Sequence, residues 1–149
     1  MGDATIASNH DETGGNVGKL TMAAMDTLRE RVADDGRCDA VLAGFERSPA
    51  LREALRALVQ AQHQLLQAEH EVAQVADVLR RDQKYAPAGR PSIHIVQLRK
   101  QQAAAKQVML IARQRLAQVA QTFVQASGLA VKAKQSPSEA VAAWLQALR

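Results

Sequence analysis

The sequence predicts an all-α protein built on a long antiparallel helical hairpin, with smaller N- and C-terminal helices packed against it as a bundle. Three observations support this prediction. Apolar residues recur at alternating steps of four and three along two long stretches, which is the pattern of a helical seam. A short segment containing Pro and Gly separates these stretches. Alternating runs of Val, Ile and Thr, which would indicate a sheet, are missing from the sequence.

The first hairpin helix is expected to begin at Pro49. Ser48 can cap its amino terminus, and Pro is compatible with the first helical turn. The apolar positions that share one face are Ala54, Leu58, Ala61, Leu65, Ala68, Val72, Val75 and Leu79. Pro87 and Pro91 cannot continue the helix, so residues 85–92 are expected to form the tip of the hairpin.

The second hairpin helix is expected to begin after Ser92 and to end at Gly128, which can adopt a left-handed cap. Its seam contains Gln102 as the one polar residue, and its apolar members are Ile95, Leu98, Ala105, Met109, Ala112, Leu116, Val119, Phe123 and Ala126. Two helices of similar length with a short connection pack antiparallel. The hairpin therefore spans about residues 49–127.

The chain before the hairpin is expected to contain a disordered segment followed by helices. Residues 1–18 are polar and rich in small side chains, which indicates a disordered arm, and residues 19–149 then form a single helical domain. A helix is expected from Leu20 to Ala33, ended by the residues Asp34, Asp35 and Gly36. A short helical piece follows it. Both segments are expected to pack across the base of the hairpin.

A last helix is expected at about residues 137–149. Ser136 and Glu139 have the spacing of a capping box, and Pro137 lies at the first helical position. The residues that would form its apolar face are Val141, Trp144, Leu145 and Leu148.

The charge of the chain is divided between its two halves. Up to Leu79 there are seven Lys and Arg against thirteen Asp and Glu, a balance of −6. Between Gln83 and Ser138 there are nine Lys and Arg and no acid, a balance of +9, although the whole chain carries a formal net charge of only +4. The second half therefore offers a basic surface to an anionic partner.

No catalytic, metal-binding or cofactor-binding set is expected, so the sequence favours a protein that is not an enzyme. His63 and His70 are seven residues apart on the face opposite the seam, about 10 Å along the helix axis, which is too far for one ion without a third element. They are expected to be solvated or to face a partner. Cys38, the single cysteine, has no neighbouring His and is expected to be an inert thiol. A lone cysteine and the lack of a leader or membrane-spanning run favour the cytoplasm.

The candidate nucleic-acid-binding residues form two groups. One is the hairpin tip, where the antiparallel helices bring six cations together beside Tyr85, opposed only by Asp82: Arg80, Arg81, Lys84, Arg90, Arg99 and Lys100. The other is a row at seven-residue spacing on the second helix, formed by Arg99, Lys106 and Arg113. Glu69 or Glu71 is expected to lie close enough to neutralise Lys106, whereas Arg113 has no acid near it.

These features favour two functions. The first is binding of a nucleic-acid backbone, RNA or single-stranded DNA, within a larger assembly. The alternative is a self-assembling or adaptor hairpin that binds protein partners, as in a secretion, virion or scaffold component. A membrane surface is a third partner compatible with a basic helical face.

The acid-free basic hairpin inside a small helical chain resembles the small helical subunits of multi-subunit CRISPR effector complexes. The resemblance covers the architecture from about Leu20 to Arg149 and the basic residues named above. It implies a subunit without a catalytic site that stacks on copies of itself and contacts a nucleic-acid strand through its backbone. Other protein subunits are also possible partners within such an assembly.

Overall fold

The computed structural model describes residues 20–86, 89 and 91–148, and it confirms the all-α prediction. Within these residues no strand occurs, and the five helices are α2 (Met22–Arg31), α3 (Asp35–Val41), α4 (Pro49–Lys84), α5 (Ile93–Ser127) and α6 (Pro137–Ala147). The arm predicted for residues 1–18 lies outside the described residues. No helix in the described part of the chain is long and apolar enough to cross a membrane.

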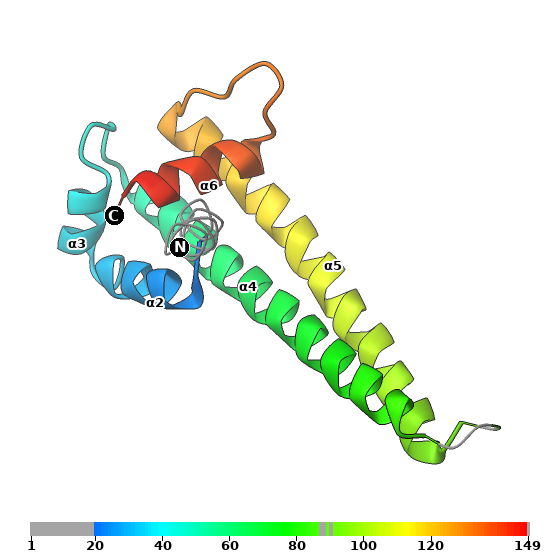
Figure 1. Cartoon of the computed structure of the whole chain (residues 1–149). Coiled ribbons are helices and arrows are strands. Elements are labelled where there is room, and N and C mark those ends of the chain that lie inside the picture. Colours follow the sequence, from blue (N-terminus) through cyan, green and yellow to red (C-terminus); the bar gives the residue numbers. More distant parts are fainter. Residues whose placement is uncertain (1–19, 87–88, 90, 149) are drawn as a thin grey trace, which may run out of the picture.

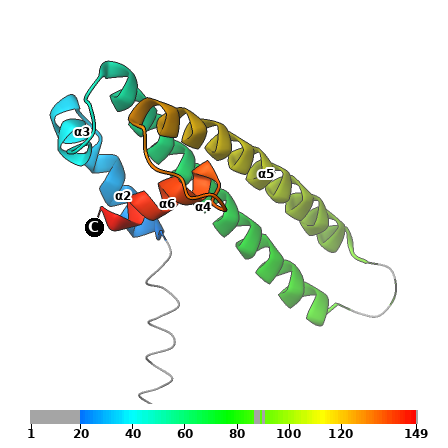
Figure 2. The ribbon, with the colours of Figure 1, turned by 90° about the horizontal axis from the view of Figure 1, so that it is seen from above.

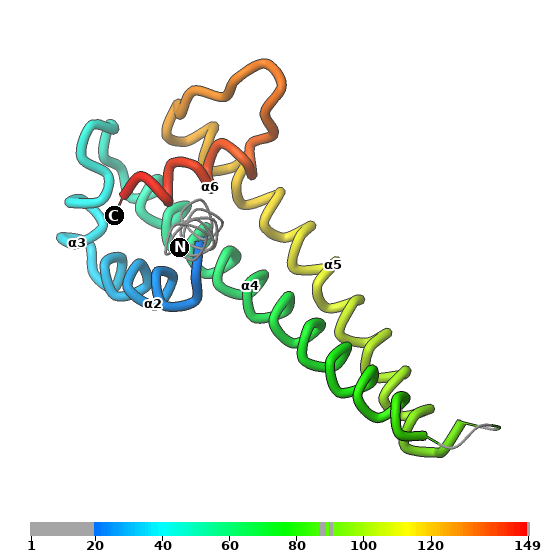
Figure 3. Tube along the Cα trace, in the orientation of Figure 1, coloured from blue at the N-terminus to red at the C-terminus, as the bar shows by residue number. Residues whose placement is uncertain are grey.

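The predicted hairpin is the dominant element of the fold. α4 and α5 run antiparallel side by side and extend well beyond the other helices (Figure 1). The smaller helices gather at the base, the end of the hairpin opposite its tip, in both views (Figures 1 and 2). The Cα trace shows the segment after α5 turning back, so that α6 lies across this base (Figure 3). The outer half of the hairpin therefore has no other helix of the described chain against it.

The helix ends have the chemical causes that the sequence predicted. The Ser48 hydroxyl accepts a hydrogen bond from Leu51 N at 3.1 Å, which caps α4. Ser92 caps α5 in the same way, and Ser136 opens α6 with the expected capping box. Gly128 ends α5 at φ 72°, a left-handed conformation that residues with a Cβ rarely adopt.

The prediction for residues 34–36 was wrong in part. Asp34, Asp35 and Gly36 were expected only to end the first helix, but α2 already ends at Arg31 and residues 35 and 36 belong to α3. The Asp34 carboxylate accepts from Arg37 N at 2.8 Å and so caps a new helix immediately.

The main core lies at the base of the hairpin, as the predicted packing of the small helices requires. Phe45, Phe123 and Trp144 come from three separate segments, and their ring centroids lie 5.0–6.4 Å apart. Such aromatic pairs contribute about 0.5–1.5 kcal/mol each beyond the area that they bury. A second, much smaller cluster near the tip contains Leu79, Ile95 and Leu98.

Between these two cores the hairpin is thin. From Glu69 to Val78 on α4, and from Arg99 to Arg115 on α5, no side chain is fully buried. Small residues at the seam, such as Ala105 and Ala112, explain this, because they let the backbones approach but bury little area. Ala126, predicted to belong to the seam, is exposed, so the seam of α5 ends at Phe123.

Candidate nucleic-acid interface

The second hairpin helix presents its charges because its apolar residues occupy the seam. Burial of Ile95, Leu98, Leu116 and Phe123 fixes which face of α5 contacts α4 and the base. All the cations of the helix fall on the remaining faces and are exposed: Arg99, Lys100, Lys106, Arg113 and Arg115. The helix contains no Asp or Glu. α5 is therefore a rod with a positive potential along much of its length.

Arg99, Lys106 and Arg113 form a continuous row, which we call the basic flank. Their seven-residue spacing places neighbouring cations about two turns apart, and the row spans about 21 Å. Among the described residues none of the three forms an ion pair. The pairing of Lys106 with Glu69 or Glu71 that the sequence predicted is not formed. Lys106, Glu69 and Glu71 are all exposed. An ion pair between exposed side chains costs side-chain entropy and gains little electrostatic energy in water.

The tip is less positive than the sequence predicted. Asp82 was expected to be the only acid there, but the Asp77 carboxylate accepts a hydrogen bond from the Arg80 guanidinium. Asp82 in turn lies 4.0 Å from Arg81 and 2.6 Å from Nε2 of His94. Arg80 and Arg81 therefore have carboxylate partners.

Sequence reasoning missed two residues at this end of the hairpin, Asp77 and His94. Asp77 and Arg80 are three residues apart, the spacing at which helical side chains meet, so this pair could have been anticipated. The contact between His94 and Asp82 depends on the register of α4 against α5, which composition does not reveal.

The other predicted tip cations differ in their surroundings. Lys100 is exposed, and Lys84 Nζ lies 5.6 Å from the centre of the Tyr85 ring. Tyr85 is 77% exposed, so one face of its ring contacts Lys84 while much of the side chain stays open to solvent. Arg90 lies outside the described residues. Among the described residues, the cations without a carboxylate partner at this end are therefore Lys84 and Lys100 with Arg99 of the basic flank.

His63 was predicted to be solvated or to face a partner, but it is buried against α2 of its own chain. Its side chain is only 6% exposed, because α2 packs on the side of α4 that lies away from α5. His63 Nε2 lies 3.2 Å from Asp26 Oδ1 and 3.5 Å from a nitrogen of the Arg29 guanidinium. His70, seven residues further along, is exposed as predicted. His63 thus joins two helices, and the two imidazoles have different surroundings.

Cys38 has the surroundings of an unreactive thiol, which agrees with the prediction. It is fully buried, and its Sγ donates to the Val32 carbonyl at 3.3 Å. Burial raises the pKa of the Cys38 thiol, and this effect outweighs the charge of Arg56, which acts in the opposite direction. The thiolate, the nucleophilic form of cysteine, is therefore disfavoured.

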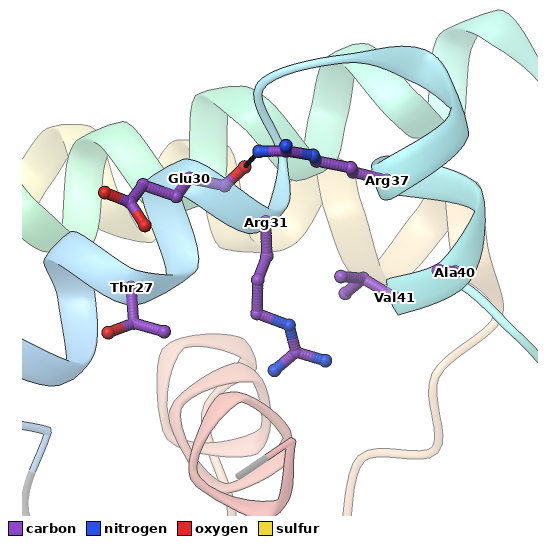
Figure 4. A pocket seen from close by; sticks show the side chains of 6 residues that line it. All are labelled: Thr27, Glu30, Arg31, Arg37, Ala40 and Val41. Carbon is purple, nitrogen blue, oxygen red and sulfur yellow. Dashed lines mark hydrogen bonds between the residues drawn. The ribbon is translucent and has the colours of Figure 1, made fainter.

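A hollow of about 250 Å³ lies beside α2 and α3 (Figure 4). The Arg31 side chain points from it toward α6 and donates to the Leu148 carbonyl at 2.7 Å. Arg37 donates to the Glu30 carbonyl at 3.1 Å. Both guanidinium groups thus hold backbone carbonyls at the base.

Within the described residues, no group of three or more His, Cys, Asp or Glu could hold a metal ion. Comparison of the chain with protein-family models, with curated proteins and with solved structures finds no match.

Proposed function

We propose that this protein is a non-enzymatic helical subunit that binds a nucleic-acid backbone along the basic flank of α5, within a larger assembly. The observation that carries the proposal is the row of Arg99, Lys106 and Arg113, exposed and without ion pairs among the described residues. The phosphates of a nucleic-acid backbone are anions at regular spacing, and a row of cations can contact them in succession. Such contacts do not depend on the identity of the bases.

The form of the ligand follows from the shape of the site. A row of separate guanidinium and ammonium groups on a convex helix offers no pocket for a single nucleotide, and it suits a strand that lies along the helix. Lys100 and the exposed Tyr85 extend this surface toward the tip, where a ring can stack on an unpaired base. We therefore favour single-stranded RNA or DNA, which is also the kind of contact implied by the resemblance to small CRISPR effector subunits.

The test compares two variants that each remove two positive charges. Lys106→Ala/Arg113→Ala removes cations without ion pairs in the described chain, and Arg80→Ala/Arg81→Ala removes cations that Asp77 and Asp82 already partner. Binding of a fluorescent single-stranded oligonucleotide is measured at several salt concentrations. The first variant should weaken binding to unrelated sequences equally and reduce the slope of log K against log salt by about 0.7 per lost phosphate contact.

The control variant should lose less affinity, because its cations have local carboxylates to compete with phosphate. Arg99→Ala/Lys100→Ala should behave like the flank variant, since both residues are exposed and free of acids on their own helix. Thermal unfolding should confirm that all variants stay folded. Unchanged affinity and salt slope in the folded flank variant would exclude this surface as a nucleic-acid site.

A further inference from the structure

The two long edges of α5 differ in chemistry. The basic flank residues each follow a seam position by one: Leu98 precedes Arg99, for example. Gln101, Val108 and Arg115 instead each precede a seam position. One residue is a rotation of about 100° around the helix, so stepping forward and stepping back from the seam lead to opposite sides. Val108 therefore lies across the seam from the basic flank.

This second edge carries an exposed apolar stripe, which we call the apolar flank: Ala104, Val108 and Ile111. Its steps of four and three are those of a helix-packing seam. Val108 is 52% and Ile111 56% exposed, which is high for large apolar side chains at packing spacing. The stripe falls within the thin stretch of the hairpin, where α4 and α5 bury no side chain fully. The molecule thus leaves its apolar side chains uncovered where its own packing is weakest.

A groove opens beside this flank, toward the tip. It has a volume of about 460 Å³ and is lined by Gln74, Val75, Asp77 and Val78 of α4 and by Leu98 and Gln101 of α5. Gln101 is seven residues from Val108, so the groove continues the same edge of the hairpin. Its wall combines valines, amides and one carboxylate. Such a lining suits a long side chain with an apolar stem and a positive end.

We propose that the apolar flank is the docking surface for a second copy of this chain, with the two α5 helices antiparallel about a two-fold axis near Val108. Gln101 and Arg115 are each seven residues from Val108, in opposite directions. An antiparallel pairing centred on Val108 therefore brings Arg115 of each copy beside Gln101 of the other. That is the position of the groove, where Asp77 supplies the opposite charge.

The symmetry makes this arrangement self-complementary. A two-fold interface uses one surface twice, so a cation and an acid on opposite sides of the axis form two equivalent contacts. Arg115 is exposed and has no ion pair among the described residues, and Asp77 is exposed with Arg80 beside it. The apolar side chains occupy the centre and the charges the rim, as in other protein interfaces. The proposal does not depend on nucleic-acid binding, since the basic flank stays on the far side of α5.

The test is the oligomeric state of the full chain, measured by sedimentation velocity over a dilution series. The wild type should be a dimer that dissociates on dilution. Val108→Asp/Ile111→Asp should raise the dimer dissociation constant by roughly thirtyfold or more, as loss of central interface residues does. The matched control is Leu110→Asp. Leu110 is 48% exposed and adjoins the basic flank, so this variant should dimerise like the wild type.

A charge exchange tests the register. Arg115→Asp should weaken the dimer, and adding Asp77→Arg to it should restore association, because the pair is then reversed in both copies. Far-ultraviolet circular dichroism checks that each variant remains helical. A monomeric wild type, a dimer that survives Val108→Asp/Ile111→Asp, or a dimer broken by Leu110→Asp would each overturn the proposal. A dimer that depends on Val108 but gains nothing from the charge exchange would overturn the two-fold register.

Discussion

The Arg52 guanidinium donates to both carboxylate oxygens of Asp39, from Nε to Oδ1 at 2.8 Å and from Nη2 to Oδ2 at 3.1 Å, and so ties α4 to α3. This hydrogen bonding lowers the pKa of Asp39 and outweighs desolvation, which acts in the opposite direction. The contact therefore makes the stability of the base depend on pH.

The sign follows from the lowered pKa. A carboxyl group with a lower pKa in the folded state contributes stability that is fully present above its unfolded value of about 3.9 and is lost as the pH falls through the folded value. Asp39→Asn should therefore destabilise the protein at neutral pH, and the difference from wild type should shrink in strong acid. Denaturant unfolding of both proteins across this range measures it. A difference that stays constant with pH would contradict the role of the charge.

His63 and His70 offer a matched pair of substitutions. His63→Ala should lower the free energy of unfolding by about 1–3 kcal/mol, because it removes a buried side chain that contacts Asp26 and Arg29 of α2. His70→Ala should change it by less than about 0.5 kcal/mol, because His70 is exposed. Chemical denaturation of the two variants checks this. Equal effects would mean that the contact between α2 and α4 contributes nothing at His63.

Two glycines should respond to alanine with opposite signs. Gly128 has φ 72°, and no atom stands near the position of an added Cβ, so Gly128→Ala should cost about 1 kcal/mol through backbone strain alone. Gly36 lies inside α3, where the nearest atom to an added Cβ is Asp34 Oδ1 at 3.5 Å, an ordinary contact. Gly36→Ala should therefore stabilise the protein by about 0.4–1 kcal/mol. Midpoints of thermal unfolding that move in the same direction would contradict this reasoning.

The Cys38 thiol should be protected in the folded state. Its raised pKa and full burial both disfavour attack on a chromogenic disulfide reagent. We expect slow release of the chromophore from the native protein and release of one equivalent within minutes in denaturant. The rate in the native protein should follow the opening of the base. Phe123→Ala should therefore increase this rate, because Phe123 is fully buried in the same core as Cys38. Fast labelling of the native chain would show that the thiol is accessible.

Much of the fold follows from local pattern. The heptad seams predict the hairpin because burial along a helix pair has a fixed period, and Ser48, Ser92 and Ser136 mark helix starts through contacts within three residues. The burial of His63 could not be predicted in this way. It depends on α2, whose Asp26 and Arg29 contact His63 at a position of α4 that lies outside the seam.

The candidate site was predictable in position but not in charge balance. Lys106 and Arg113 lie on one exposed flank because spacing alone places them there. Whether a cation has a partner depends on side-chain geometry across two helices. Arg80 was predicted to be opposed only by Asp82 and is paired with Asp77, whereas Lys106 was predicted to be neutralised and forms no ion pair among the described residues.

The separation of the large core from the small cluster of Leu79, Ile95 and Leu98 divides the hairpin into units of unequal cooperativity. The outer unit, which contains this small cluster, can open locally without exposing Phe123 or the base. Its amide protons should therefore exchange with deuterium through an opening whose free energy is well below that of global unfolding. The thin stretch between the two cores, which buries no side chain fully, is the boundary between this local opening and unfolding of the base. A bound nucleic-acid strand or a second copy would then stabilise the outer unit against local opening, and slower hydrogen exchange there would indicate that it has bound.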